Sequence, residues 1–136
     1  MITVFGSAGL RDKEKRRLMA EVSAELADLT VLTAEDPRTE SLASILDEMA
    51  GGMLEKGGIE RSNFWRVPDR GGAIKFALDL AQKGDVVLVC GKGHEQSMCF
   101  GETEYPWDDR TATKSALADL MGKSGPKMPS LPTTVS

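Results

Sequence analysis

The five residues Gly-Lys-Gly-His-Glu at positions 91–95 combine backbone freedom with three ionisable side chains. They follow the run Asp-Val-Val-Leu-Val-Cys at 85–90 without a break. A continuous apolar run of this kind predicts a strand buried on both faces, as in a parallel sheet covered by helices. Ligands of such sheets bind beyond the carboxyl ends of the strands, and glycines let the backbone approach them closely. The pattern therefore predicts a binding site directly after this strand.

Two further loops carry charges that suit an amino acid. Residues 6–11 and 35–38 also follow predicted strands, so we expect all three loops at one edge of the sheet. Arg11 and Arg38 can each bind a carboxylate through two parallel hydrogen bonds. Glu35, Asp36 and Glu95 can hold an ammonium group. Together these charges predict a pocket for a zwitterion, namely a free amino acid.

Each feature also has a simpler interpretation when taken alone. Residues 35–38 could form only a turn before the next helix, and a lone histidine such as His94 is more often structural than catalytic. The basic stretch Arg11–Arg17 could be a solvated helix start with an Asp12–Arg16 pair. Alternatively, it faces an anion from a loop and a helix N-terminus. We expect it to serve small anions and contacts with other domains.

Composition limits the class of protein. The 136 residues are 40% hydrophobic and 28% charged, which is typical of one soluble globular domain. A net charge of -4 argues against nucleic-acid binding. No apolar run approaches the roughly 20 residues that span a bilayer, and no signal peptide opens the chain. Cys90 and Cys99 lack metal-ligand spacing, which indicates reduced thiols in a cytoplasmic protein.

Strand and helix patterns alternate along the chain. Short apolar segments predict strands at 2–5, 30–33, 64–67 and 85–90. Helical periodicity predicts helices between them, at 13–27, 42–53, 71–82 and 108–121. Asp12 and Asp69 are expected to cap two helices. Residues 97–107 fit a loop or hairpin, and 122–136 a disordered tail. The order predicts one α/β domain, Rossmann-like, with a mostly parallel sheet and helices on both faces. The first helix gathers its larger apolar residues on one face: Leu18, Met19, Val22 and Leu26.

Four segments resemble, in the same order, the C-terminal domain of the bacterial Mur ligases. The similarity is to the UDP-N-acetylmuramoyl-tripeptide synthetase type, which adds the third residue of the stem peptide. It covers residues 2–121, and the Gly-Lys-Gly-His-Glu block is its most specific part. The matching segments are Val4–Met19, Glu35–Arg38, Gly84–Glu95 and Pro106–Arg110.

The resemblance implies one domain of a three-domain ligase. In that family a central domain binds ATP with Mg²⁺ and phosphorylates a UDP-linked muramoyl dipeptide, and the C-terminal domain delivers the incoming diamino acid. The resemblance implies that Arg38 grips the distal carboxylate of meso-diaminopimelate and that Arg11 assists. It implies that Gly91 and Glu95 hold the distal amino group. Catalytic residues are expected in the other domains, and the supporting loop residues here are Asp12, Lys92, Gly93 and His94.

The chain departs from the family pattern in two ways. Glu35 and Asp36 stand where diaminopimelate enzymes usually have aspartate and asparagine, which removes an amide donor and adds a charge that repels a carboxylate. The amino acid added, diaminopimelate or lysine, therefore stays open. The chain also has no Gly-x-x-x-x-Gly-Lys-Ser/Thr phosphate loop and lacks the segment that normally opens this domain. It is thus expected to be inactive alone, either as a fragment or as a standalone copy.

Three alternatives remain from the residues. The first is a related Mur-like ligase with another acceptor, and the second is a standalone anion- or nucleotide-binding module. The third is a metal hydrolase that uses His94, Glu95, Asp108 and Asp109. One histidine makes a poor ligand set, so we expect no metal site.

Overall fold

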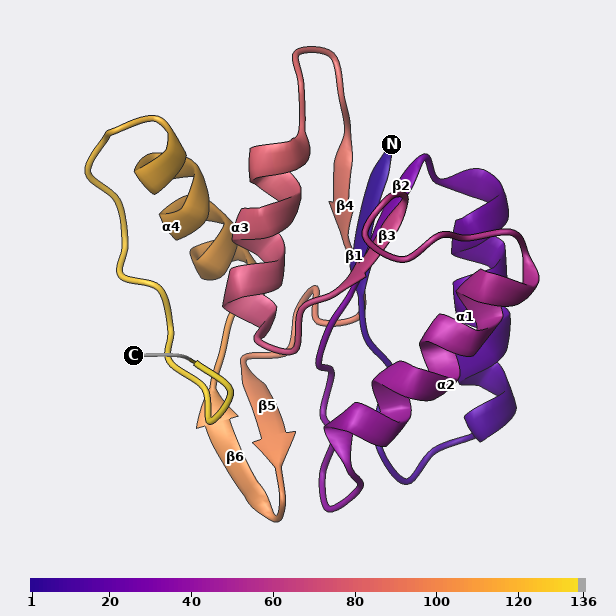
Figure 1. Cartoon of the computed structure of the whole chain (residues 1–136). Coiled ribbons are helices and arrows are strands. Elements are labelled where there is room, and N and C mark those ends of the chain that lie inside the picture. The colour runs from indigo at the N-terminus through magenta and orange to yellow at the C-terminus, as the bar shows by residue number, and fades with distance from the viewer. Residues whose placement is uncertain (135–136) are drawn as a thin grey trace.

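Four parallel strands form the centre of the molecule, which a computed structural model describes over residues 1–134. They lie in the order β3–β2–β1–β4. The strands are β1 (Ile2–Phe5), β2 (Leu29–Leu32), β3 (Phe64–Arg66) and β4 (Val87–Val89). In Figure 1 helices cover both faces of the sheet, which confirms the predicted α/β fold. The helices form two pairs, α1 (Lys13–Leu26) with α2 (Leu42–Glu55), and α3 (Arg70–Leu80) with α4 (Asp109–Leu120).

Alternation along the strands divides the core into two halves. Ile2 and Val4 of β1 pack with α3 and α4, whereas Phe5 packs with α2 and the buried part of α1. The neighbouring strand keeps the same alternation, because Val4 is in register with Val31 and Phe5 with Leu32. A residue shifted by one would face the opposite side, so this pattern fixes the register. The carboxyl ends of the strands are therefore held in fixed relative positions.

β4 lies at the edge of the sheet and is less buried than predicted. Leu88 is 41% exposed, although the apolar run 85–90 indicated a strand buried on both faces. The prediction was wrong because β4 pairs only with β1 among the described strands. Leu88 is in register with Thr3, on the face opposite to the one that α3 covers.

The apolar face of α1 is also exposed. Leu18 is 47%, Val22 54% and Leu26 71% exposed, so the face on which the sequence gathers these residues is largely uncovered. The helix instead meets the sheet through small residues, Ala20 and Ser23, and the Ser23 hydroxyl lies 2.7 Å from that of Thr3. The larger side chains line a groove of about 380 Å³ that Cys90 also borders.

Aspartate side chains cap three of the four helices. Asp12 accepts a hydrogen bond from the Glu14 N–H, and Asp69 accepts one from the Gly72 N–H, which confirms both predicted caps. Asp108 caps α4 in the same way. Side-chain caps of this type contribute about 1 kcal/mol each. They fix where α1 and α3 begin, close to the loops that follow the strands.

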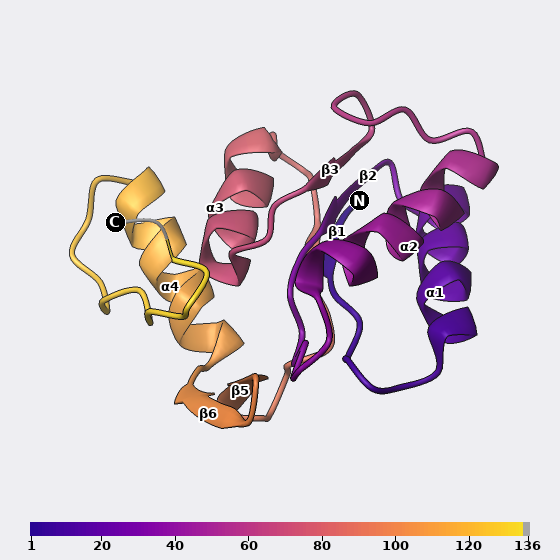
Figure 2. The same ribbon diagram turned by 60° about the horizontal axis from the view of Figure 1, so that its bottom comes forward.

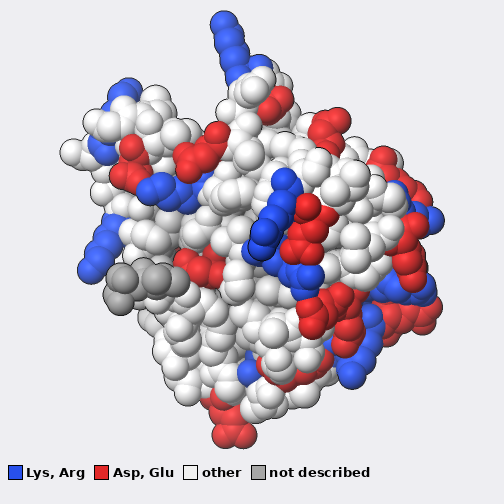
Figure 3. All heavy atoms as spheres, in the orientation of Figure 1, with Lys and Arg blue, Asp and Glu red and all other residues white. Residues whose placement is uncertain are grey.

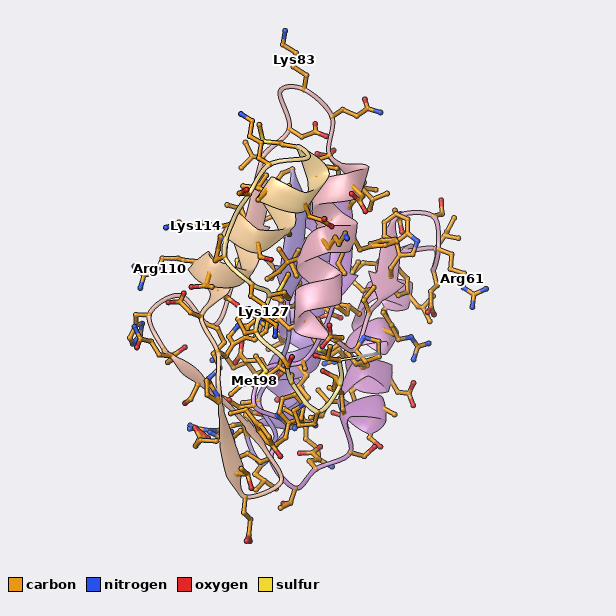
Figure 4. All side chains as sticks on the ribbon, turned by 90° about the vertical axis from the view of Figure 1, so that its left-hand side faces the viewer. Arg61, Lys83, Met98, Arg110, Lys114 and Lys127 are labelled. Atoms are coloured by element: carbon orange, nitrogen blue, oxygen red, sulfur yellow. The ribbon has the colours of Figure 1, made fainter. Side chains whose placement is uncertain are left out.

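A β-hairpin extends the carboxyl edge of the sheet. Its strands, β5 (Ser97–Phe100) and β6 (Thr103–Pro106), are antiparallel, so the predicted loop or hairpin is a hairpin. In Figure 1 it lies at the bottom, at the end to which β4 points, and Figure 2 brings this end forward. Met98 of β5 is fully buried and lies among densely packed side chains in Figure 4. Within residues 1–134, none of the helices is long and apolar enough to cross a membrane.

Part of the segment after α4, for which the sequence predicts a disordered tail, packs against the domain. Leu131 is only 5% exposed and joins the core beside α3 and α4, and Met128 packs against that core. The Thr133 hydroxyl donates to Asp69 Oδ1 at 2.8 Å. These few anchors lie in a polar, proline-rich context, which is why composition alone indicated disorder. Val135 and Ser136 lie outside the described residues.

Candidate functional site

The three loops predicted to meet at the sheet edge are in contact. The Gly9 N–H of the first loop donates to the Asp36 carbonyl of the second at 2.8 Å. Lys92 Nζ of the third loop lies 2.6 Å from Asp36 Oδ2. Glu35 Oε1 lies directly over Gly91. The second loop is thus the centre of the site, with the other two on either side of it.

Two glycines make these contacts possible. A Cβ atom on Gly91 would lie 1.8 Å from Glu35 Oε1, and the residue has φ +103°. A Cβ atom on Gly9 would lie 1.8 Å from the Pro37 carbonyl oxygen. Both distances are far inside van der Waals contact, so only glycine fits either position. The close approach expected from the glycine at position 91 is made by a neighbouring protein loop.

Asp36 is bound within the protein. Its Oδ1 atom accepts the Cys99 N–H at 2.8 Å, and its Oδ2 atom pairs with Lys92. The side chains of Asp36 and Lys92 are 16% and 4% exposed. Because the two charges largely cancel at this separation, Asp36 repels a nearby carboxylate much less than its charge alone predicts. The backbone of Asp36 has φ +39°, an uncommon value that these contacts maintain.

Arg38 leaves the same loop with its guanidinium group partly free. Its Nη1 atom donates to the Gly9 carbonyl at 3.2 Å, and its backbone is held on both sides by Cys99 and Gly101 of the hairpin. Its φ is +57°. Among residues 1–134 its Nε and Nη2 atoms have no hydrogen-bond acceptor. These donors are therefore available to a carboxylate, as the predicted role of Arg38 requires.

Glu35 is the most perturbed carboxyl group of the site. Its Oε1 atom is buried and has no hydrogen-bond partner within residues 1–134. The pKa of Glu35 is raised to about 7, mainly by burial; the nearby charge of Arg70 opposes this rise, Asp36 and Glu95 add to it, and Lys92 opposes it. A buried carboxylate without a donor favours a cationic partner, because pairing offsets the cost of burying the charge.

The raised pKa of Glu35 predicts a pH-dependent loss of stability. The unfolded carboxyl ionises near 4.5 and the folded one at about 7, so the stabilising contribution is complete below 4.5 and lost as pH rises to about 7. Relative to Glu35→Gln, the wild-type chain should lose unfolding free energy across this interval. Urea unfolding at several pH values measures the difference. Two curves that stay parallel from about pH 4 to about pH 8 would contradict the assignment.

The remaining predicted site residues point outward. The His94 side chain is 93% exposed and lies 3.9 Å from Glu95, whose side chain is 43% exposed. Arg11 and Gly93 are exposed as well. Asp12 caps α1 and does not line the site. Glu95 and Arg11 are thus accessible to a ligand, whereas the exposure of His94 gives it no fixed orientation.

One expected contact of the basic stretch is not formed. Arg16 does not pair with Asp12; it is buried, and its guanidinium binds Glu40 at 2.5 and 2.7 Å. Glu40 in turn accepts the Leu10 N–H, and these contacts lower the pKa of Glu40 to about 2. Arg16 therefore stabilises the first loop through Glu40, which binds the Leu10 N–H of that loop. Figure 3 shows acidic and basic side chains interspersed over the face in view.

Sequence reasoning missed a buried network behind the loops. Arg70 binds both carboxylate oxygens of Asp109 at 2.8 Å, and Trp107 Nε1 donates to Asp109 Oδ1 at 2.7 Å. Arg70 also donates to the Ala34 and Cys90 carbonyls. An arginine between Asp69 and two glycines, at the start of a largely apolar helix, was the available signal.

The network also bears on the metal-hydrolase alternative. Asp109 is occupied by Arg70, Asp108 caps α4, and His94 is exposed. Within residues 1–134, no group of three or more His, Cys, Asp or Glu side chains could hold a metal ion. The four residues of that alternative do not form a ligand set.

Known proteins are similar to this chain in both sequence and fold. A family model described as "Mur ligase, glutamate ligase domain" matches residues 1–93. A UDP-N-acetylmuramyl-tripeptide synthetase of Roseiflexus sp. (strain RS-1) is 44% identical over 120 residues, which are 88% of this chain and 24% of that protein. A UDP-N-acetylmuramoyl-L-alanyl-D-glutamate--2,6-diaminopimelate ligase of Fusobacterium nucleatum is 41% identical over 117 residues, 86% of this chain and 23% of that protein.

A solved structure agrees with these relatives. A UDP-N-acetylmuramoyl-L-alanyl-D-glutamate--2,6-diaminopimelate ligase superimposes with a TM-score of 0.77 and 35% identity, and the match covers 90% of this chain and 24% of that one. The chain thus spans about a quarter of the length of the proteins it matches. The region that the family model matches contains β1 to β4, the first two site loops and the beginning of the third. The chain therefore belongs to the Mur ligase family, as a Mur ligase C-terminal domain.

Proposed function

We propose that this chain is the amino-acid-binding domain of a cytoplasmic, ATP-dependent ligase of peptidoglycan synthesis. The ligase adds a diamino acid, meso-diaminopimelate or lysine, to UDP-N-acetylmuramoyl dipeptide. Residues 2–121 form the domain, and its partners are the N-terminal and central domains of the same ligase. The observation that carries the proposal is the contact of three loops around Glu35, with an arginine and a second glutamate at their surface.

The site offers two poles to a zwitterionic side chain. Arg38 supplies free guanidinium donors for the distal carboxylate, and Arg11 lies exposed on the adjoining loop. Glu35, after β2, and Glu95, on the loop after β4, supply carboxylates for the distal ammonium. Diaminopimelate has both distal groups and lysine only the ammonium. The Asp36–Lys92 pair removes the repulsion that would otherwise disfavour diaminopimelate.

The domain contributes to the reaction by orientation. With the distal end of the amino acid fixed, its other amino group is presented to the acyl phosphate as a nucleophile. Holding two reactants together in this way is worth about 7–11 kcal/mol of the barrier in favourable cases. ATP and Mg²⁺ belong to the central domain, since this chain has neither a phosphate loop nor, in residues 1–134, a carboxylate cluster for a metal.

Ligand binding tests the proposal directly. Isothermal titration of the chain with meso-diaminopimelate, lysine and glutamate should give the tightest binding for diaminopimelate, weaker binding for lysine and the weakest for glutamate. Glutamate lacks the distal ammonium that Glu35 and Glu95 would bind. Equal affinity for all three, or a preference for glutamate, would contradict the two-pole site. A preference for lysine over diaminopimelate would keep the ligase and change its substrate.

The chain alone should produce no ADP and no peptide bond. Phosphoryl transfer needs a phosphate-binding loop and its magnesium site, and the sequence contains no such loop. A coupled ADP assay with UDP-N-acetylmuramoyl dipeptide and diaminopimelate measures this. If the purified 136-residue chain released ADP in a dipeptide-dependent way, the ATP site would lie in this chain and not in the central domain.

Nucleic acid should not bind to the basic stretch of α1. Arg16 is buried against Glu40, and Arg17 lies near Glu21 and Glu55. Two of the basic residues are thus paired, and Asp12 and Glu14 lie among the others in a chain of net charge -4, which disfavours the phosphate contacts that supply most non-specific affinity. Fluorescence anisotropy with labelled duplex and single strands should show no saturable binding near physiological salt. Submicromolar binding with a steep salt dependence would overturn this expectation.

A further inference from the structure

One buried arginine lies behind the two loops that bring Glu35 and Gly91 together. Arg70 opens α3, and its side chain is 0% exposed. Its Nη1 atom donates to the Ala34 carbonyl at 3.0 Å, and its Nη2 atom donates to the Cys90 carbonyl at 2.8 Å. Ala34 and Cys90 directly precede Glu35 and Gly91. A single guanidinium group thus joins the bases of both loops.

Asp109 fixes the plane of this guanidinium group. Its two carboxylate oxygens accept from Nε and Nη2 of Arg70, each at 2.8 Å, and Trp107 Nε1 holds the carboxylate from the other side at 2.7 Å. Two parallel hydrogen bonds set both distance and orientation, which a lysine ammonium cannot do. The direction of the Arg70 donors toward the two carbonyls therefore depends on Asp109.

Stability alone explains this arrangement poorly. Removing two charges from water is costly, and well-packed apolar residues of similar volume often stabilise a core as well as a buried ion pair does. Apolar residues, however, could not bridge two carbonyl groups on strands that are not neighbours. In this sheet β1 lies between β2 and β4. The arginine spans that gap at the residues from which the site loops leave.

We propose that Arg70, oriented by Asp109, is the positioning residue of the amino-acid site. It holds the ends of β2 and β4 so that Glu35 and the loop of Gly91 stay at the separation that accepts the distal ammonium of the diamino acid. Only the identity of this ligand depends on the proposed function. The clamp, which is Arg70 with Asp109 and the Ala34 and Cys90 carbonyls, can be tested without knowing the ligand.

The charge of Arg70 gives the clamp a spectroscopic signature. Glu35 is faced by Asp36 from its own loop, by Lys92 and Glu95 from the loop after β4, and by Arg70 from α3. Loss of the Arg70 charge should therefore shift the Glu35 titration upward. Loss of the Asp109 charge leaves Arg70 unneutralised and should shift it downward. These opposite shifts test whether the Arg70 guanidinium and its Asp109 partner lie beside Glu35, and ligand binding by Arg70→Lys tests whether they position the site.

The test is a carboxyl ¹³C NMR titration of Glu35 in the 136-residue chain. Arg70→Met should raise the midpoint, and Asp109→Asn should lower it, each by about one pH unit. Arg66→Met is the matched control: it removes an arginine that is paired with Glu60 and Asp47 at the end of β3. This control should leave the Glu35 midpoint unchanged. Unchanged midpoints in folded Arg70→Met and Asp109→Asn would overturn the proposal.

Milder variants keep the test decisive if these two fail to fold. Arg70→Lys retains the charge and loses the planar contacts, so it should keep the midpoint while weakening meso-diaminopimelate binding about 10- to 100-fold. Trp107→Phe removes the donor to Asp109 together with part of a buried ring, and it should weaken meso-diaminopimelate binding less than Arg70→Lys does. Unaltered binding by folded Arg70→Lys would overturn the positioning role. Shifted midpoints in a chain that binds no amino acid would support the clamp and refute the proposed ligand.

Discussion

Replacing Arg38 by alanine is expected to raise KM for meso-diaminopimelate about 30-fold in a ligase that contains this domain. The value corresponds to about 2 kcal/mol, the lower end of the 2–5 kcal/mol that a desolvated charge pair contributes. We expect the lower end because Arg38 is only partly buried. KM for lysine should change much less, since lysine has no distal carboxylate. Steady-state kinetics with both amino acids gives the ratio.

Arg61 provides a matched control for this substitution. It too is an arginine with positive φ, +68° against +57° for Arg38, so both alanine variants have a similar backbone cost. Figure 4 shows Arg61 pointing away from the molecule. Arg61→Ala should leave both KM values unchanged, whereas Glu95→Gln should raise both because both ligands carry the distal ammonium. An equal rise for lysine and diaminopimelate in Arg38→Ala would make Arg38 a structural residue of the loop.

The order of strands and helices could be predicted because each pattern depends on local periodicity. Helix caps at Asp12 and Asp69 and the meeting of three loops also followed from the sequence, since the carboxyl ends of parallel strands share one edge. The exposure of Leu88 and Val22 could not be predicted from the sequence. Apolar periodicity shows which residues share a face, but whether another element covers that face depends on tertiary structure.

The partners of charged residues were the least predictable part of the site. Sequence spacing suggested Asp12 as the partner of Arg16, whereas Glu40 on a distant loop binds it. Asp36 was expected at the ligand site, and its pairing with Lys92 was not predicted. Long-range pairs have no periodic signature in the chain. Their selection depends on which donors and acceptors are buried together, because a buried charge must find a partner.

Replacing Asp109 by alanine is expected to lower the free energy of unfolding by about 3–5 kcal/mol. Asp109 is 6% exposed and Arg70 0%, so the variant leaves a buried guanidinium without its counter-charge and also removes the acceptor of Trp107 Nε1. A loss of this size is a large share of the stability of a small domain. Urea unfolding followed by circular dichroism measures it.

Asp119 offers the control, because it forms an ion pair with Lys75 that joins the same two helices at the surface. Those side chains are 63% and 50% exposed, and water solvates the remaining charge when one partner is removed. Asp119→Ala should therefore leave unfolding nearly unchanged. The double variant Arg70→Met/Asp109→Leu should be more stable than Asp109→Ala, since no unpaired charge remains buried. Equal losses for Asp109→Ala and Asp119→Ala would show that water reaches Arg70, and that the two loops are not held by a dry ion pair.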